Sequence, residues 1–477
     1  MATSENLKKK VVDGIIWSIF EKGGTQIISF IISVVLARLI MPDQFGMVAM
    51  LGVFTGISGI FIDSGFSNAL IRKTNRTQAD CCTVYWYNIL VSIFFYWVLF
   101  FCAPLIAKFY GIHELILILR ISSLTLIIGS FAGVQRALLN AEMNFKALTK
   151  YNLLGLILSG TVGIILAFLD FKVWAIVLQN ITSSLFGTVV VFYKVKWKPS
   201  LIISKQSFKE FFSYGSKLLA SGVLDNVYGN LYQVVIGKIY KSSDLAFYNR
   251  AQNLASLTSA TPTSILHSIT FPALCKLQED DEKLKIIYRK FVRLTCFIVF
   301  PLCIGIGAVA FPLINVVYTE TWIFSASLLS IIVFAFMWYP LHSINVNLLI
   351  VKGKSKLFLK LEIIKKIQGI IILAASIPLG LLGICWGSVI NSILCLIWNT
   401  HYTGKFLNMG IFAQLQDILP TMVLSTCMFV GARFIANWLG NDIISLICSV
   451  GIGSIIYIGG AYIFKFPEVQ ELKNIRK

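Results

Sequence analysis

Residues 14–46 read GIIWSIFEKGGTQIISFIISVVLARLIMPDQFG. Most of these residues are apolar, and the run is long enough to cross a bilayer as one helix. Two charged residues, Glu21 and Lys22, and the amide of Gln26 nevertheless lie inside it, around the glycine pair at 23–24. A charge in the bilayer core costs about 2.5–3.5 kcal/mol or more, so it usually faces protein or water. The stretch therefore predicts a membrane helix with one polar face turned away from lipid.

The whole chain has the composition of a membrane protein. Of its 477 residues, 57% are hydrophobic and 13% are charged, and the mean hydropathy is +0.80. A soluble domain carries roughly 25% charged residues. The formal charge of +19 comes from short basic loops between apolar runs, so it indicates orientation in a membrane and not nucleic-acid binding. We therefore expect an all-α polytopic membrane protein.

Cysteine and histidine give no sign of a metal site. The ten Cys include no Cys-x-x-Cys pair, and the four His are scattered along the chain. Neither a disulfide framework nor a metal centre is expected. The acidic run within 278–290 is interpreted as a solvated charge run, rather than as the metal site of a glycosyltransferase. We expect no cofactor.

The apolar runs divide into about 14 predicted transmembrane helices. Their approximate ranges are 14–37, 45–63, 83–105, 115–134, 152–170, 173–193, 213–238, 247–271, 291–312, 325–348, 357–377, 380–400, 417–438 and 443–464. An even number places both termini on one side of the membrane. If that side is the cytosol, 31 of the 41 Lys and Arg fall in cytosolic segments and six on the opposite side, as the positive-inside rule requires.

A weak internal repeat divides the chain into halves. Residues 37–46, ARLIMPDQFG, align with residues 237–246, GKIYKSSDLA, at an offset of 200 without gaps. An offset of six spans gives both copies the same orientation, so the repeat is predicted to be parallel. The expected organisation is a six-helix lobe at 1–193, a basic cytosolic linker at 194–212 and a second six-helix lobe at 213–400. Two additional helices and a basic cytosolic tail follow at 401–477.

Several motifs together resemble a known transporter family. A first span with Trp17, Glu21 and paired glycines, then LARLIMPDQFGMVAM (36–50) and DSGFSNALIRK (63–73), is similar to the polysaccharide-flippase branch of the multidrug/oligosaccharidyl-lipid/polysaccharide exporter superfamily. Within that branch the chain most resembles the Wzx-type translocases of lipopolysaccharide, O-antigen and exopolysaccharide. The resemblance implies two lobes around a cavity lined largely by spans 1, 2, 7 and 8. It also implies transfer of an undecaprenyl-pyrophosphate-linked glycan across the bacterial inner membrane by alternating access.

A pyrophosphate and a sugar chain need cationic and hydrogen-bonding groups to cross hydrocarbon. The candidate substrate-binding residues are Lys22, Gln26, Arg72, Lys217, Asn226, Tyr228, Asn230 and Arg250. The candidates for ion coupling are Glu21 and Asp225. The expected partners are the lipid-linked glycan, membrane lipids, and a polysaccharide polymerase and chain-length regulator of the same pathway.

Each candidate also has a purely structural interpretation. Lys22 could bind phosphate, or it could snorkel to the interface or pair with Glu21. Asp225 could couple transport to an ion, or its helix could only form hydrogen bonds with its neighbours, although an intramembrane carboxylate favours function. Arg250 could receive phosphate on the outer side or simply sit at the interface, and snorkelling is favoured for Lys217. For Arg72 the positive-inside pattern is a sufficient explanation by itself.

Two other functions compete with glycan translocation. A drug or cation exporter of the same superfamily would use carboxylates such as Glu21 and Asp225, but basic residues outnumber acidic ones along the expected pathway. An integral-membrane polymerase would carry a large extracytoplasmic loop, and all such loops are short here. The sequence has no GxxxxGK[ST] phosphate-binding loop, so hydrolysis of ATP by this chain is not expected. An ion gradient is the expected energy source.

Overall fold

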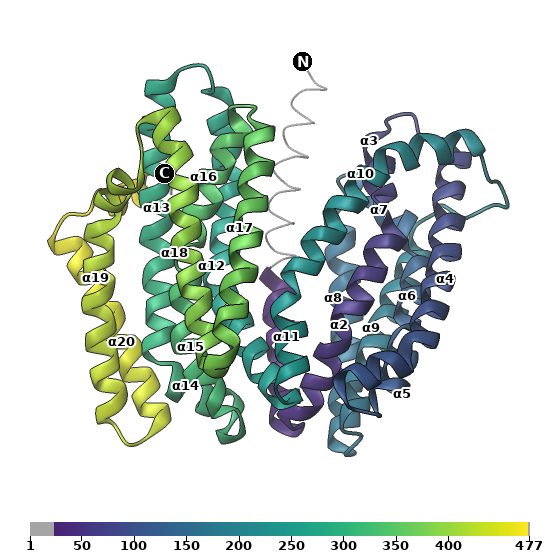
Figure 1. Ribbon diagram of the computed structural model, residues 1–477, viewed down its shortest axis with the longest axis horizontal. Helices are drawn as coiled ribbons and strands as arrows, with labels where there is room; N and C mark the ends of the chain where they lie inside the picture. Colours follow the sequence, from purple (N-terminus) through teal and green to yellow (C-terminus); the bar gives the residue numbers. More distant parts are fainter. Residues whose placement is uncertain (1–22, 476–477) are drawn as a thin grey trace. The chain divides into compact units, whose positions relative to one another are not determined.

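The computed structural model describes residues 23–475, and their regular structure is helical throughout. Glu21 and Lys22 lie outside the described residues. The chain divides into two compact units between Ala246 and Phe247, and Figure 1 shows the helices of each unit running side by side along a common direction. The prediction of an all-α membrane fold is confirmed.

The first unit begins with an apolar helix at Gly23–Leu39. Its further helices are α2 (Pro42–Asp63), α3 (Phe66–Arg72), α4 (Gln78–Tyr110), α5 (Leu115–Ser122), α6 (Leu124–Ser130), α7 (Gly133–Ala141), α8 (Phe145–Phe168), α9 (Val173–Lys194), α10 (Lys205–Gly229) and α11 (Leu231–Ile239). The sequence repeat had assigned α10 and α11 to a second lobe, but in the structure they pack within the first compact unit. The lobe boundary at 194–212 stays a prediction.

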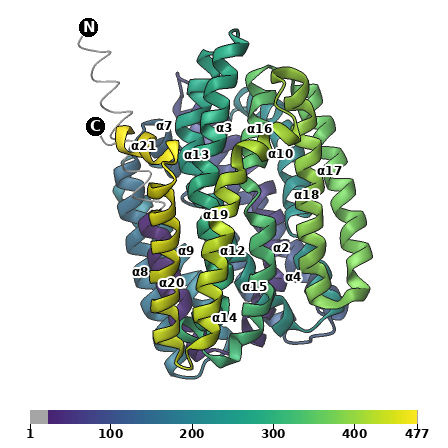
Figure 2. The same ribbon diagram turned by 90° about the vertical axis from the view of Figure 1, so that its left-hand side faces the viewer.

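The second unit starts within a long helix that crosses the boundary between the units. Its helices are α12 (Ser242–Lys276), α13 (Asp281–Ala308), α14 (Ala310–Tyr318), α15 (Ile323–Phe336), α16 (Tyr339–Val351), α17 (Ser355–Ser376), α18 (Gly380–Leu407), α19 (Ile411–Trp438), α20 (Asp442–Ile463) and α21 (Pro467–Ile475). Figure 2 shows α13, α19 and α20 running lengthwise, with the short α21 across one end of α20.

The number of apolar spans differs from the 14 expected. Among the described residues, nine helical segments are long and apolar enough to cross a membrane, or ten if the pair Leu115–Ser130 and Gly133–Ala141, bent by 46°, is one span. The predicted spans at 213–238 and 247–271 are helical, but they are too polar to qualify. The spans at 357–377 and 380–400 correspond to the separate helices α17 and α18, which count as one of the nine because they are continuous over Ser355–Leu407. Span 1 extends beyond the described residues. The count of 14 therefore stays a prediction.

Local sequence explains where α4 begins and ends. The Thr77 hydroxyl accepts a hydrogen bond from the Asp80 backbone N–H at 3.2 Å, and the Asp80 carboxylate accepts one from the Thr77 N–H at 2.9 Å. This reciprocal pair is a capping box, which satisfies backbone donors that the helix leaves free. At the other end Gly111 takes a left-handed conformation with φ of 75°, which glycine adopts without strain.

The two copies of the sequence repeat have the same backbone conformation. Each preceding helix ends with a hydrogen bond of 2.9 Å, from Ile40 N to Leu36 O and from Tyr240 N to Ile236 O. The next helix then begins at residue 42 in one copy and at residue 242 in the other. A correspondence at this offset supports the internal repeat.

The two copies also touch each other. A Cβ atom added to Gly46 would lie 1.8 Å from the Ser242 carbonyl oxygen, so only glycine fits at this position. The Ser242 hydroxyl donates a hydrogen bond to the Asp43 carboxylate. The N-terminal ends of α2 and α12 are therefore locked together by backbone contact.

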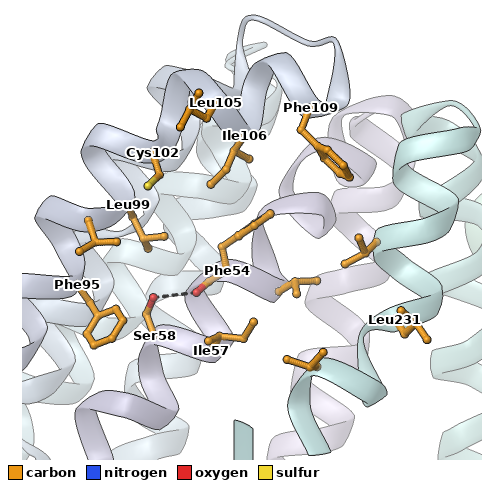
Figure 3. Close-up of a pocket in the computed structure, with 14 residues that line it drawn as sticks. Phe54, Ile57, Ser58, Phe95, Leu99, Cys102, Leu105, Ile106, Phe109 and Leu231 are labelled. Atoms are coloured by element: carbon orange, nitrogen blue, oxygen red, sulfur yellow. Dashed lines mark hydrogen bonds between the residues drawn. The ribbon is translucent and has the colours of Figure 1, made fainter. Parts of the chain in front are cut away.

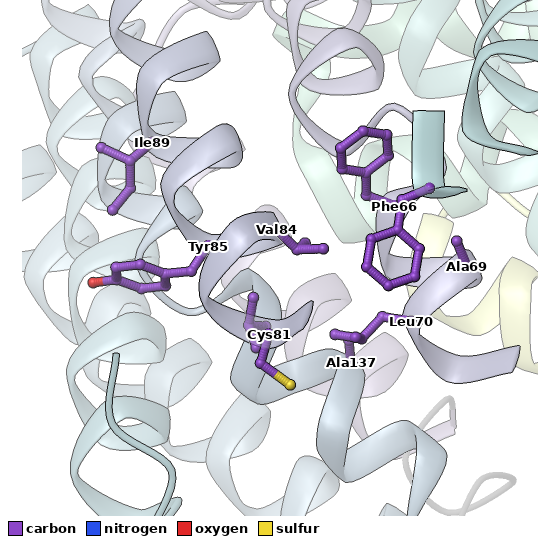
Figure 4. Close-up of a cluster of buried hydrophobic side chains, with 10 residues drawn as sticks. Phe66, Ala69, Leu70, Cys81, Val84, Tyr85, Ile89 and Ala137 are labelled. Atoms are coloured by element: carbon purple, nitrogen blue, oxygen red, sulfur yellow. The ribbon is translucent and has the colours of Figure 1, made fainter. Parts of the chain in front are cut away.

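A buried hydrophobic cluster holds α3, α4 and α7 together at one end of the first unit (Figure 4). Phe66 and Leu70 of α3 meet Val84 of α4 and Ala137 of α7 there, with Phe211 of α10 also in the cluster. Burying a side chain of this size contributes about 1.5–3 kcal/mol. The cluster fixes the end of α10 that leads into the polar region described below.

Candidate functional site

The candidate site lies within the first unit, along α10 and the two helices beside it. The break between α2 and α3 brings α10 close, because Ser64 and Gly65 both take left-handed conformations, with φ of 44° and 70°. A Cβ atom on Gly215 of α10 would lie 2.2 Å from the Ser64 carbonyl oxygen. The motif DSGF at 63–66 thus forms a tight bend against which α10 packs.

The second half of α10 carries the predicted polar residues. Asp225 is exposed, whereas Asn226, Tyr228 and Asn230 are half-buried. The Asn230 amide donates to the Asn226 carbonyl oxygen at 2.8 Å and to the Asn226 side-chain oxygen at 3.1 Å. The Asn226 amide in turn lies against Gly56 of α2, where a Cβ atom would be 3.4 Å from its nitrogen. The structure therefore brings these four residues together at the end of α10, where Asn230 caps the helix and its amide is linked to that of Asn226.

The basic residues at the α3 end have different surroundings. Lys73 forms ion pairs with Asp80 at 3.1 Å and with Glu210 at 2.9 Å, and the hydrogen bond with Glu210 raises the pKa of Lys73. Arg76 donates to the Leu70 carbonyl oxygen at 2.8 Å. Both side chains thus stabilise the turn between α3 and α4.

Arg72 is the predicted candidate in this group, and it is exposed. Its guanidinium lies 5.1 Å from the centre of the Tyr214 ring on α10, a cation–π distance. None of the ion pairs among the described residues includes Arg72. Its charge is therefore accessible beside α10.

An apolar cavity of about 630 Å³ adjoins the polar part of α10 (Figure 3). Its walls come from α2, α4, the end of α10 and α11. The lining residues are Val53, Phe54, Ile57, Ser58, Phe95, Val98, Leu99, Cys102, Leu105, Ile106, Phe109, Val227, Leu231 and Val234. The one hydroxyl among them, on Ser58, donates to the Phe54 carbonyl oxygen at 2.9 Å, so the cavity presents an almost purely hydrocarbon surface.

A second, polar pocket of about 600 Å³ lies at the far end of the same helices. It is bordered by the start of α2, the end of α4 and the turn between α11 and α12, with Asp43, His113, Glu114 and Lys241 among its lining residues. Tyr110 lines the polar pocket, and its ring packs edge-on against the ring of Phe54, which lines the apolar cavity. The centres of the two rings are 6.4 Å apart. Along α2 and α4 the first unit therefore presents an apolar cavity followed by a polar pocket.

The other predicted site residues are placed separately. Gln26 is exposed on the helix Gly23–Leu39, and Lys217 lies in α10. Arg250 belongs to the second unit and is buried, with its guanidinium 4.7 Å from the centre of the Tyr318 ring and 4.8 Å from that of Trp322. Arg250 thus packs against aromatic rings of its own unit, and its role in binding substrate stays a prediction.

Sequence reasoning missed two polar clusters in the second unit. The His342 ring contacts the Ser392 hydroxyl and the Asn399 amide, each at 3.0 Å. Near one end of the unit, Asn345 accepts a hydrogen bond from the Tyr288 hydroxyl at 2.9 Å and exchanges bonds with Gln414. The signal was the short spacing between two of the polar residues of α16, His342 and Asn345, inside a largely apolar run. The apolar cavity had no such signal, because its lining looks like lipid-facing sequence.

The fold and the site define a multi-pass helical membrane protein with polar and apolar recesses inside one unit. A family model described as polysaccharide biosynthesis protein matches residues 35–327. The chain belongs to this family.

Curated relatives span most of the chain. The teichuronic acid biosynthesis protein TuaB of Bacillus subtilis is 23% identical over 429 residues, which cover 89% of this chain and 88% of the relative. The succinoglycan biosynthesis transport protein ExoT of Rhizobium meliloti is 23% identical over 324 residues, which cover 68% of this chain and 66% of ExoT. The structure is similar to that of the lipid II flippase MurJ in its inward closed conformation, with a TM-score of 0.76 and 16% sequence identity. The match covers 94% of this chain and 98% of the MurJ chain. This likeness places the chain in the same fold.

Proposed function

We propose that this protein is a transporter that moves a lipid-linked polysaccharide precursor from one leaflet of a membrane to the other. The observation that carries the proposal is the juxtaposition on α10, where the amides Asn226 and Asn230 adjoin an apolar cavity of about 630 Å³. A ligand with a polar head and a hydrocarbon tail fits such a pair of surfaces. The family matches this chemistry, because its members act in polysaccharide biosynthesis.

The amides at the end of α10 and the Arg72 guanidinium replace water around the polar part of the substrate. Moving hydroxyl and phosphate groups through hydrocarbon without partners costs several kcal/mol for each group. Amide side chains replace water for sugar hydroxyls, and the accessible Arg72 guanidinium supplies a fork for phosphate oxygens. The polyprenyl tail needs no such partner, and the apolar wall of α4 and α11 accommodates it.

The finer features of this function belong to the same proposal. The substrate is an undecaprenyl-pyrophosphate glycan, which moves outward across the bacterial inner membrane by alternating access. Both termini lie in the cytosol, as the distribution of basic residues indicates. An ion gradient supplies the energy, with the exposed Asp225 as the carboxylate that binds the coupling ion. A polymerase and a chain-length regulator act on the glycan after transfer.

A cation exporter of the same superfamily is the competing function. The likeness to solved structures does not separate the two, since it reports only the fold. The family assignment favours the glycan, and so does the accessible cation Arg72 beside α10.

Surface glycan in a strain that lacks this gene tests the proposal. Reintroducing the gene should restore surface glycan and remove the lipid-linked precursor that accumulates inside the cell. The substitution Arg72→Gln should lower restoration severalfold, while Lys209→Gln, which removes the same charge from an exposed position on α10, should restore it fully. Full restoration by Arg72→Gln would remove the role of this cation. A precursor level unaffected by loss of the gene would overturn the proposed function itself.

A further inference from the structure

The short helix α7 carries a basic side chain that the transport site does not use. Arg136 is partly buried between α7 and α9, and its Nη2 lies 3.2 Å from the position that a Cβ atom on Gly187 would occupy. Glycine at 187 thus leaves room for the guanidinium. Among the described residues Arg136 belongs to no ion pair, and its buried Nε has no hydrogen-bond partner.

A second unsatisfied group lies on the same face of α7. Asn88 of α4 is only 3% exposed, and its side-chain oxygen also lacks a partner among the described residues. Its nitrogen lies 3.1 Å from the Cβ position of Gly133. Gly133 and Arg136 are three residues apart, so they share a helix face at a separation of roughly 4.5 Å along the axis. Asn88 and Arg136 are therefore neighbours across one turn of α7.

A neighbouring face of α7 is closed to a ligand. Val134 and Ala137 belong to the hydrophobic cluster with α3 and α4, and Figure 4 shows Ala137 within it. The adjacent Gln135 is fully buried, and both polar atoms of its amide lack partners in the part of the chain that the structure describes. This layer of the first unit thus combines a cation with two buried amide side chains. Each unsatisfied buried polar group costs about 1–3 kcal/mol.

This layer lies just inside the hydrocarbon core, within reach of the lipid head groups. Helix α4 has 33 residues, or about 50 Å, against a hydrocarbon core of about 30 Å. If α4 is centred, about 10 Å extends beyond the core at each end. Asn88 lies ten residues after the start of α4, about 15 Å along it, and therefore roughly 5 Å below the boundary. A long arginine side chain reaches the phosphate level from such a depth.

We infer that Arg136 and Asn88 form a binding site for a phosphate ester that carries hydroxyl groups. The guanidinium pairs with the phosphate, and the Asn88 oxygen accepts a hydrogen bond from a head-group hydroxyl. Basic pockets between transmembrane helices on the cytoplasmic side bind anionic lipid head groups in this way. A glycerophospholipid such as phosphatidylglycerol supplies both groups, and so does a soluble glycerol phosphate. This site is separate from the polar part of α10 and does not depend on the transported substrate.

Lipid binding to the purified full-length protein tests the inference. Retained phosphatidylglycerol is counted by native mass spectrometry, and its apparent affinity is taken from the rise in the unfolding temperature, with phosphatidylcholine as the baseline. Arg136→Gln should weaken phosphatidylglycerol binding at least tenfold. The matched control Lys150→Gln, which removes an exposed charge from the adjacent α8, should change it less than twofold. Equal binding by wild type and Arg136→Gln, or an equal loss in the control, would overturn the site.

Two further arms identify the ligand and guard against a variant that does not fold. Asn88→Ala should retain binding through Arg136 but lose the preference for phosphatidylglycerol over phosphatidic acid, which has no head-group hydroxyl. Retention of that preference would remove Asn88 from the site. Glycerol 3-phosphate should compete only if the physiological ligand is soluble, and in that case its competition should disappear in Arg136→Gln. Competition that persists in the variant would argue against the site.

Discussion

At the residue scale, single glycines decide whether the helices of the first unit can touch. Gly46 and Gly215 each bring a helix within backbone contact of another segment, whereas Gly52 of α2 has nothing within 4 Å of its Cβ position. The same residue type thus has a packing role at two positions and none at the third. A conformational explanation based on glycine flexibility would treat all three alike.

Substituting these glycines tests the packing directly. Gly46→Ala should destabilise the protein by about 1–3 kcal/mol, because its Cβ would overlap the Ser242 carbonyl oxygen. Gly52→Ala should be neutral or stabilising by up to about 1 kcal/mol, since alanine favours the helix. Thermal unfolding in one detergent compares the two variants with wild type. Equal unfolding temperatures for both variants would contradict the contact between the repeat copies.

The proposed ion coupling is tested at Asp225, an exposed carboxylate of α10. Asp225→Asn keeps the shape of the side chain and removes its charge, so export driven by a proton or sodium gradient should fall at least tenfold while the protein level is unchanged. The control Asp170→Asn changes an exposed Asp with φ of 58°, a conformation that Asn tolerates. Surface glycan measured with and without an ionophore distinguishes the two. Transport by Asp225→Asn that still collapses with the gradient would assign coupling elsewhere.

At the element scale, Lys73 links the end of α3 to the first turn of α4 and to α10 through its ion pairs with Asp80 and Glu210. The pKa of Lys73 is raised in the folded protein by its hydrogen bond with Glu210. A group whose folded pKa exceeds its unfolded value contributes stability that is fully present below the unfolded value, about 10.4 for Lys. That contribution is lost as the pH rises through the folded pKa.

The pH dependence of unfolding checks this link. Wild type should lose more stability than Lys73→Gln between pH 9 and pH 11, and the two proteins should approach each other at the upper end. Lys209→Gln should follow wild type, since Lys209 is exposed and belongs to no ion pair of the described residues. Parallel curves for wild type and Lys73→Gln would show that the ion pairs do not stabilise the turn.

The cavity between α2, α4 and α11 offers a second test of an element. Ile57→Trp should fill part of the 630 Å³ cavity and lower glycan export severalfold while the protein still folds. Leu90→Trp adds the same bulk to α4 at a side chain that is already 61% exposed, and it should export normally. Quantified surface glycan at matched protein levels compares them. Normal export by Ile57→Trp would exclude this cavity from the pathway.

The sequence predicted elements better than it predicted the site. Apolar runs and basic loops indicate where helices lie and which ends share a side, because transfer into lipid acts on each run separately. The polar residues of α10 were found because an Asp or Asn inside an apolar helix is costly without a role. The apolar cavity was missed, since Phe95 and Leu99 resemble lipid-facing residues until packing places them. Arg136 lies just outside the predicted span 115–134, but in the structure it belongs to α7 and packs against Gly187.

At the scale of the whole molecule, the number of spans determines where the termini lie. Nine segments among the described residues are apolar enough to span, or ten with the bent pair that includes α7, while the basic-residue pattern requires 14. Of the five predicted spans that the nine segments do not show separately, three are the first span, the bent pair and one of the two helices joined in Ser355–Leu407. The other two belong to α10–α11 and α12: α11 has only nine residues, and polar residues lower the hydropathy of α10 and α12. In a transporter such helices cross the membrane because their polar faces line protein or water.

Reporter fusions discriminate between these counts. With 14 spans, a green fluorescent protein joined after Lys477 should fluoresce, because it stays in the cytosol together with the N-terminus. Alkaline phosphatase inserted at Asp170, between α8 and α9, should be active, because that loop lies outside. If α10–α11 and α12 did not cross, the helices after α12 would keep their orientation, since two spans are lost together. A phosphatase inserted in the turn at Tyr240–Lys241 therefore decides the question: activity there requires both helices to cross, and inactivity would leave their polar faces on the cytosolic side.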